Sequence, residues 1–128
     1  MAVRPTKAKQ AKRPEEIQAR TYRFALRIVM LARALPRDIA GSVLGRQVLR
    51  SGTSIGASCE EAKAAQSRAD FIHKMMVALK EARETLYWLR LIGDSELVRP
   101  SRLSNLVTEA DEIVCILTSI VRKAKSKR

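Results

Sequence analysis

The side chains capable of acid–base or metal chemistry are few in this sequence, and they do not form a recognisable motif. The single histidine, His73, follows Asp70 by three residues, but a metal centre in a helical bundle needs such a motif on two helices. Glu81 and Glu84 share one helical face, yet no histidine or nucleophile stands beside them. We therefore predict no metal site and no catalytic site, and the protein is expected to be neither an enzyme nor dependent on a cofactor.

Hydroxyl and thiol groups lack the neighbours that activate a nucleophile. Ser51, Thr53 and Ser54 lie close together without a base that the sequence can assign to them. Cys59 and Cys115 are far apart and form no Cys-x-x-Cys pair, so the usual zinc and redox motifs are excluded. We expect both cysteines to be reduced thiols in a cytoplasmic protein, with a disulfide between them as the less favoured alternative.

Basic side chains are the abundant functional groups in this sequence, and such side chains bind phosphate. The chain has 128 residues and a net charge of +12, with 25 Lys and Arg against 13 Asp and Glu. Both ends are basic and, between them, residues 14–121 carry 15 basic and 13 acidic residues. The terminal basic residues are Arg4, Lys7, Lys9, Lys12 and Arg13 at the start, and Arg122, Lys123, Lys125, Lys127 and Arg128 at the end.

Basic arms on a nearly neutral body predict a polyanionic partner, with RNA, or RNA together with DNA, ahead of an anionic membrane. The alternative is that the arms only keep the protein soluble. Within the body, Arg20, Arg23 and Arg27 follow one helical face, and Arg46 and Arg50 belong to the next segment. The first three fit a phosphate-binding stripe and a solvated helix face equally well, and all five are candidate nucleic-acid contacts.

Four amphipathic segments must position these side chains. They span about 15–35, 39–65, 68–92 and 101–123, with apolar residues at spacings of three and four and no strand-like alternation. Pro36 ends the first segment, Ser67 with Asp70 caps the third, and Gly93 is expected just beyond the end of the third. Short connections make neighbouring helices antiparallel, so we predict an all-α fold, an antiparallel up-down-up-down four-helix bundle.

The length of the chain favours a single domain flanked by short basic segments. We expect a disordered N-terminal arm over residues 1–14, the bundle over 15–123, and a C-terminal tail over 124–128. The longest apolar run is too short to span a bilayer, and no secretory signal is visible, so no membrane association is expected.

The second segment carries a stripe of glycines. Gly41, Gly45, Gly52 and Gly56 fall within an arc of about 60° on a helix. Since each mid-helix glycine costs about 1 kcal/mol relative to alanine, we expect the stripe to admit a closely packed helix, from the same chain or from another subunit. The alternative is two shorter helices broken near Gly52, although the apolar stripe stays in register across it.

Several stretches together make the chain resemble the four-helix-bundle proteins encoded in ribosomal RNA intervening sequences. The resemblance covers residues 20–120 and includes the end of the first segment, Leu35-Pro36. The other matching stretches are Leu49-Arg50-Ser51-Gly52-Thr53-Ser54-Ile55-Gly56-Ala57-Ser58-Cys59-Glu60-Glu61-Ala62, Ser67-Arg68-Ala69-Asp70-Phe71, Ala78-Leu79-Lys80-Glu81-Ala82-Arg83-Glu84-Thr85 and Tyr87-Trp88-Leu89.

That family is similar in fold to the accessory variability proteins of diversity-generating retroelements. The resemblance implies a barrel-like homopentamer without enzymatic activity that binds nucleic acid and assists an RNA-handling enzyme such as a reverse transcriptase. It also implies a polar network, within or between subunits, formed by Arg50, Ser51, Ser54, Glu61 and Glu81. A protein-interaction scaffold with no role in nucleic-acid binding is the alternative function.

Overall fold

The computed structural model describes residues 16–127, and this part of the chain forms four α-helices and no β-strand. The helices are α2 (Ile17–Ala34), α3 (Ile39–Lys63), α4 (Arg68–Asp94) and α5 (Pro100–Ser126). The prediction of an all-helical protein with four helices is therefore confirmed. The predicted N-terminal arm, residues 1–14, lies outside the described residues.

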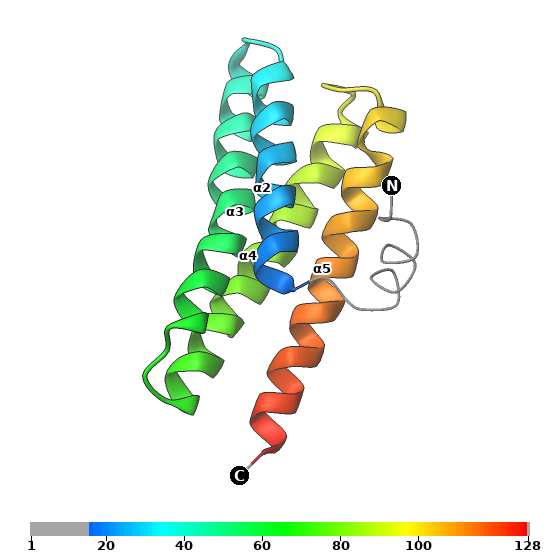
Figure 1. The fold of residues 1–128 in the computed structure, drawn as a ribbon. Helices are drawn as coiled ribbons and strands as arrows, with labels where there is room; N and C mark the ends of the chain where they lie inside the picture. Colours follow the sequence, from blue (N-terminus) through cyan, green and yellow to red (C-terminus); the bar gives the residue numbers. More distant parts are fainter. Residues whose placement is uncertain (1–15, 128) are drawn as a thin grey trace, which may run out of the picture.

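The helices run alternately up and down, each beside the one that precedes it in the chain (Figure 1). Extended backbone at Leu35 ends α2, and the Asp38 side chain caps α3 by accepting a 2.7 Å hydrogen bond from the Gly41 amide. The Ser67 hydroxyl caps α4 by accepting from the Asp70 amide at 3.0 Å. α2 and α5 close the bundle, but they pack together less extensively than the consecutive helices do.

The core lies along the seams that the apolar spacing predicts. Phe24 and Ile28 of α2, Ile55 of α3, Leu89 of α4 and Ile113 of α5 are all at most 1% exposed. Each such side chain stabilises the fold by about 1.5–3 kcal/mol through removal of apolar surface from water. Because every helix contributes to this core, the backbone positions of the exposed side chains are fixed relative to one another.

Two buried hydroxyl groups join α3 to α4 inside this core. The Thr85 hydroxyl oxygen lies 2.8 Å from that of Ser51 and 2.7 Å from the Glu81 carbonyl oxygen. Both side chains are fully buried. A relay in which Ser51 donates to Thr85, and Thr85 donates to the carbonyl, uses the single hydrogen of each hydroxyl and leaves neither donor unsatisfied.

α3 is one continuous helix through Gly52, so the interpretation as two shorter helices is wrong. The glycine stripe faces residues of the same chain. A Cβ atom at Gly52 would lie 2.8 Å from Ile28 Cγ2, and one at Gly56 would lie 3.3 Å from the Thr21 hydroxyl oxygen. The missing side chains thus allow α3 to approach α2 closely.

The end of α4 differs from the prediction. Gly93 lies inside the helix, buried, where a Cβ atom would be 3.3 Å from Leu103 Cδ1. The residue with left-handed backbone is Glu96, at φ 60°. Its amide donates to the Gly93 carbonyl at 3.1 Å, and the Leu97 amide donates to the Ile92 carbonyl at 3.2 Å. These two bonds form a Schellman motif with a glutamate where glycine is usual.

Replacement of Glu96 by glycine is expected to raise the free energy of unfolding by about 0.5–1 kcal/mol, because glycine adopts positive φ without steric cost. Urea denaturation of Glu96→Gly against wild type measures the change. Glu96→Ala is the control, since alanine removes the charge but keeps the Cβ atom. A gain in the alanine variant equal to that in the glycine variant would show that charge, rather than backbone conformation, is responsible.

α5 extends to Ser126 instead of ending near residue 123. Lys123 and Lys125 therefore lie in its last turn, where their positive charges complement the negative end of the helix dipole. The last turn also meets the start of α4, since the Arg68 guanidinium donates to the Lys127 carbonyl. Much of the predicted basic tail is thus part of the bundle.

Candidate nucleic-acid interface

The arginine stripe of α2 is partly neutralised by α5. Arg20 Nε donates to Glu109 Oε2 at 2.6 Å and its Nη2 to Glu109 Oε1 at 2.9 Å, and Nη2 also bonds Glu112. The hydrogen bond from Arg20 holds the pKa of Glu109 below its usual value. Arg20 is therefore neutralised within the chain by two acids of α5, and its role as a nucleic-acid contact stays a prediction.

This ion pair makes stability depend on pH. The pKa of Glu109 is lower in the folded protein than in the unfolded chain, where it is about 4.3. The pair therefore stabilises the fold fully above about pH 5, and the benefit is lost as pH falls through the lower folded pKa. We expect Glu109→Gln to cost about 1–2 kcal/mol at pH 7 and progressively less toward pH 3.

Unfolding free energies of wild type and variant, measured from pH 7 to pH 3, test this expectation. Glu112→Gln is the matched control, because the Glu112 side chain is 55% exposed against 21% for Glu109, and its cost should be smaller. A difference between wild type and Glu109→Gln that stays constant across the range would contradict a role for the ionised carboxylate.

The other arginines of the stripe remain at the surface. Arg23 and Arg27 are exposed, and their charges add to that of Arg20 in lowering the pKa of Glu109. Together with Arg20, Phe24 and Glu109, they line a small cavity of about 70 Å³. Of the three arginines, Arg27 lies nearest the α2–α3 turn, and within the described range it is the one available to an external anion.

Arg50 belongs to a surface network rather than to a free basic patch. Its guanidinium donates to Gln47 Oε1 at 3.0 Å, to Glu81 at 3.4 Å and to Glu84. The indole Nε1 of Trp88 donates to the same Glu84 carboxylate at 3.0 Å. Two acids of α4 thus neutralise Arg50 within the chain, and its assignment as a nucleic-acid contact stays a prediction.

Most of the polar residues of the family motif contact one another within the chain. Arg50 pairs with Glu81 across α3 and α4, while Ser51 bonds Thr85 in the core. The Ser54 hydroxyl donates to the Arg50 carbonyl oxygen of its own helix at 2.8 Å. Glu61 is exposed and does not join them. Because Thr85 also bonds the Glu81 carbonyl oxygen, Arg50, Ser51, Ser54 and Glu81 are linked through contacts within one chain, and Glu61 alone of the five lies apart.

A groove between α2 and α3 gathers the arginines that remain available. Arg33 from the last turn of α2, Arg37 from the connection and Arg46 from α3 line a hollow of about 370 Å³. All three are exposed, and none forms an ion pair with a described residue. The remaining lining is Ala32, Leu35, Pro36, Gly41, Ser42, Gly45 and Leu49. We call this hollow the α2–α3 groove.

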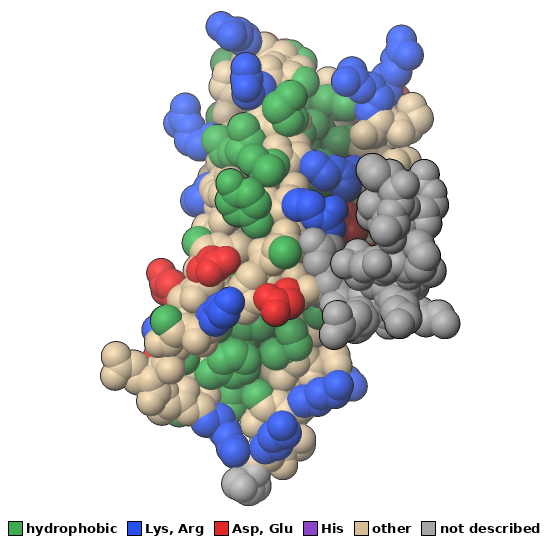
Figure 2. Space-filling model, viewed as in Figure 1, with side chains coloured by type: hydrophobic (Ala, Val, Ile, Leu, Met, Phe, Trp, Pro, Cys, Tyr) green, Lys and Arg blue, Asp and Glu red, His purple; other side chains and the backbone are tan. Residues whose placement is uncertain are grey.

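Sequence reasoning found Arg46 but missed Arg33 and Arg37. They belong to different segments, so no single helical face contains all three. The short connection between α2 and α3 is the sequence feature that could have grouped them, because it places the last turn of α2 beside the first turns of α3. Figure 2 shows basic side chains gathered at the end of the bundle that holds this connection.

The basic ends of the chain are described only in part. Arg122, Lys123, Lys125 and Lys127 are exposed at the end of α5. Five predicted contacts near the start, and one at the end, lie outside the described residues: Arg4, Lys7, Lys9, Lys12, Arg13 and Arg128. Within the described range, no helix has the length and apolar character needed to cross a membrane.

The potential nucleophiles and metal ligands do not form a site in the described range. Cys59 is buried, and burial raises the pKa of its thiol to about 11, whereas Cys115 is exposed. Both are free thiols. His73 is exposed beside Lys80 and Arg83. Among residues 16–127 no three His, Cys, Asp or Glu side chains are placed to hold a metal ion.

Comparisons with known proteins agree with this architecture. The family model described as "23S rRNA-intervening sequence protein" matches residues 14–119. A solved structure of a protein of unknown function, from the S23 ribosomal protein family of Bacteroides thetaiotaomicron, is 44% identical with a TM-score of 0.78. The alignment covers 82% of this chain and 97% of that one. No curated protein matches this chain. Sequence and fold together place the chain in the 23S rRNA-intervening sequence protein family.

Proposed function

We propose that this protein is a non-catalytic RNA-binding oligomer whose folded body, and not only its ends, contacts phosphate. The observation that carries the proposal is the α2–α3 groove, with Arg33, Arg37 and Arg46 exposed and outside any ion pair with a described residue. Guanidinium groups bind phosphate through paired hydrogen bonds. The name of the matched family refers to ribosomal RNA, which supports RNA as the nucleic acid.

The groove suits a bent or single-stranded segment of RNA. Its arginines come from two helices and the connection between them, and Leu35, Pro36 and Leu49 provide apolar surface in between. Phosphates would meet the guanidinium groups while a sugar or base covers the apolar surface. No aromatic side chain lines the groove, so recognition would follow charge and shape instead of base stacking.

The proposal includes assembly and a partner. A cytoplasmic homopentamer that assists an RNA-handling enzyme, for example a reverse transcriptase, follows from the resemblance to accessory variability proteins. Five copies would present five grooves, and contacts that are weak singly would add through multivalency.

A salt titration of full-length protein against a labelled structured RNA tests the proposal. We expect the logarithm of the binding constant to fall linearly with the logarithm of salt concentration, as counterions are released from phosphate. Replacing Arg33, Arg37 and Arg46 by glutamine should flatten that slope by about 2–3, because each lost phosphate contact contributes roughly 0.7–0.9. Fluorescence anisotropy gives both quantities.

The matched control removes three positive charges elsewhere. Lys80, Arg83 and Arg90 are exposed on α4, and their replacement by glutamine should leave the slope near that of wild type. A further variant with glutamine at Arg4, Lys7, Lys9, Lys12 and Arg13 measures the share of the N-terminal segment. Absence of binding by wild type at about 50 mM salt, where phosphate contacts are strong, would refute RNA binding altogether.

A scaffold without nucleic-acid binding is the second candidate, and one surface favours it. Tyr22, Leu26 and Met30 form an apolar stripe on the outer face of α2, with 64%, 51% and 62% of their surfaces exposed. Contiguous apolar surface is typical of protein–protein contacts. Native mass spectrometry of wild type and of Leu26→Glu measures whether this stripe holds copies together, and a scaffold would remain oligomeric while ignoring RNA.

A further inference from the structure

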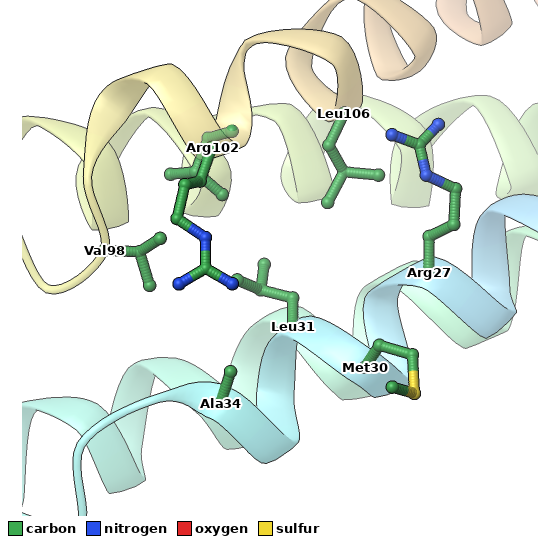
Figure 3. A pocket seen from close by; sticks show the side chains of 8 residues that line it. Arg27, Met30, Leu31, Ala34, Val98, Arg102 and Leu106 are labelled. Carbon is green, nitrogen blue, oxygen red and sulfur yellow. The ribbon is translucent and has the colours of Figure 1, made fainter.

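A second hollow lies where α2 and α5 close the bundle, at the end that holds the α2–α3 turn (Figure 3). Its volume is about 340 Å³. Apolar side chains form most of its wall, and Met30, at its edge, is 62% exposed. The two charged members are Arg27 and Arg102, one from each helix. The apolar members are Met30, Leu31, Ala34, Val98, Leu103 and Leu106. We call this hollow the α2–α5 cavity.

The same seam shows, farther along, how such an arginine is satisfied. Arg20 of α2 lies opposite Glu109 of α5, and both oxygens of that carboxylate accept hydrogen bonds from it. In the α2–α5 cavity itself, Arg102 lies near Leu31 and Ala34 at one end, and Arg27 lies near Leu106 at the other (Figure 3).

The result is a pair of like charges beside an apolar hollow. Neither Arg27 nor Arg102 forms an ion pair with a described residue. The intervening position on α5, four residues before Glu109, is Asn105, which also brings no negative charge. An external carboxylate would supply for Arg27 and Arg102 what Glu109 supplies for Arg20.

We propose that the α2–α5 cavity docks an acidic peptide segment of a protein partner. One bulky apolar side chain of that segment enters between Leu31, Leu103 and Leu106, while neighbouring carboxylates bind Arg27 and Arg102. The cavity has room for one such side chain, and the two guanidinium groups flank it from opposite helices, as Figure 3 shows. An apolar anchor surrounded by charge-assisted hydrogen bonds is a usual form of interface hot spot.

The lining favours a peptide over nucleic acid. Its apolar members are aliphatic, and no aromatic ring is present on which a base would stack. A strongly apolar wall also suits an aliphatic or aromatic side chain better than a ribose. This site is separate from the α2–α3 groove, and the inference does not rest on RNA binding.

Fluorescence anisotropy with a defined peptide tests the proposal on full-length protein. The probe is a short fluorescein-labelled peptide with a central tryptophan flanked on each side by glutamates. We expect it to bind, and we expect at least tenfold weaker binding when the tryptophan is replaced by alanine or the glutamates by glutamine. Equal binding of all three peptides, or no binding of the first, would overturn the proposal.

Variants of the protein separate the cavity from general attraction to a basic molecule. Arg27→Gln with Arg102→Gln removes two charges at the cavity, and Arg83→Gln with Arg90→Gln removes two exposed charges on α4 as the control. Ala34→Trp fills the cavity from an exposed position without changing charge. The proposal requires at least tenfold weaker peptide binding in the first and third variants and less than twofold change in the control.

Other outcomes identify a different occupant and overturn the proposal. Loss of RNA affinity with unchanged peptide affinity in the Arg27→Gln, Arg102→Gln variant would assign the cavity to nucleic acid. A change in oligomer mass of Ala34→Trp, with peptide binding retained, would assign it to a second copy of the chain. Circular dichroism of each variant verifies that the helices are intact.

Discussion

Gly41→Ala and Gly52→Ala are expected to be the most destabilising single substitutions in the α3 stripe, each lowering the free energy of unfolding by about 1–3 kcal/mol or more. At Gly41 the new Cβ atom would lie 2.0 Å from the backbone carbonyl oxygen of Pro36. At Gly52 it would lie 2.8 Å from Cγ2 and 2.9 Å from Cγ1 of Ile28. Neither obstacle can move freely, since one is main chain and the other is fully buried.

Gly45→Ala is the matched control within the same helix. Its Cβ atom would meet Leu35 Cδ1 at 3.2 Å, which is the end of a flexible side chain. The gain in helix propensity, about 1 kcal/mol, then offsets the crowding, so we expect this variant to be neutral or slightly more stable. Urea denaturation of the three variants gives the order, and an equal loss in all three would show that close packing on α2 is not the cause.

Thr85→Val is expected to cost about 1–3 kcal/mol although the two side chains have the same shape. The substitution removes the hydroxyl that links Ser51 to the Glu81 carbonyl, and it leaves the Ser51 hydroxyl buried without that partner. A buried polar group that loses its hydrogen bond pays its full cost of desolvation. Thermal and urea denaturation of the variant measure the loss.

A double-mutant cycle with Ser51→Ala tests this explanation. Ser51→Ala with Thr85→Val removes both hydroxyls, so the double variant should be more stable than the sum of the single changes predicts. The expected coupling is about 1 kcal/mol. Strict additivity would mean that the two hydroxyls do not stabilise the fold through each other, in spite of the 2.8 Å distance between them.

The helices were predictable because the features that define them, apolar spacing and boundary residues, are local in the sequence. Apolar residues at three-and-four spacing located all four of them, and Pro36 and Ser67 located two of the boundaries. Gly93 misled the prediction because its cause is tertiary: the residue is small where α4 meets Leu103, and the left-handed turn is made by Glu96 instead. The sequence alone does not show whether a glycine near a helix end allows close packing or forms a left-handed turn.

The candidate site was less predictable for a related reason. Whether an arginine is available depends on acids that can stand anywhere in the chain, and those of Arg20 are 89 and 92 residues away. Arg50 is neutralised in the same way by α4. Conversely, Arg33 and Arg37 join Arg46 only after α2 and α3 fold together, so spacing along one helix does not group them.

The limited packing of α2 against α5 affects how quickly the chain folds. The extensive contacts join helices that follow one another in sequence, while the contact between the first and last described helices is small. Most native contacts therefore form without closing a long loop, which gives the chain a low contact order. Folding is expected within microseconds to milliseconds, as for other helical bundles. The last helix, α5, can dock after α3 and α4 have packed together.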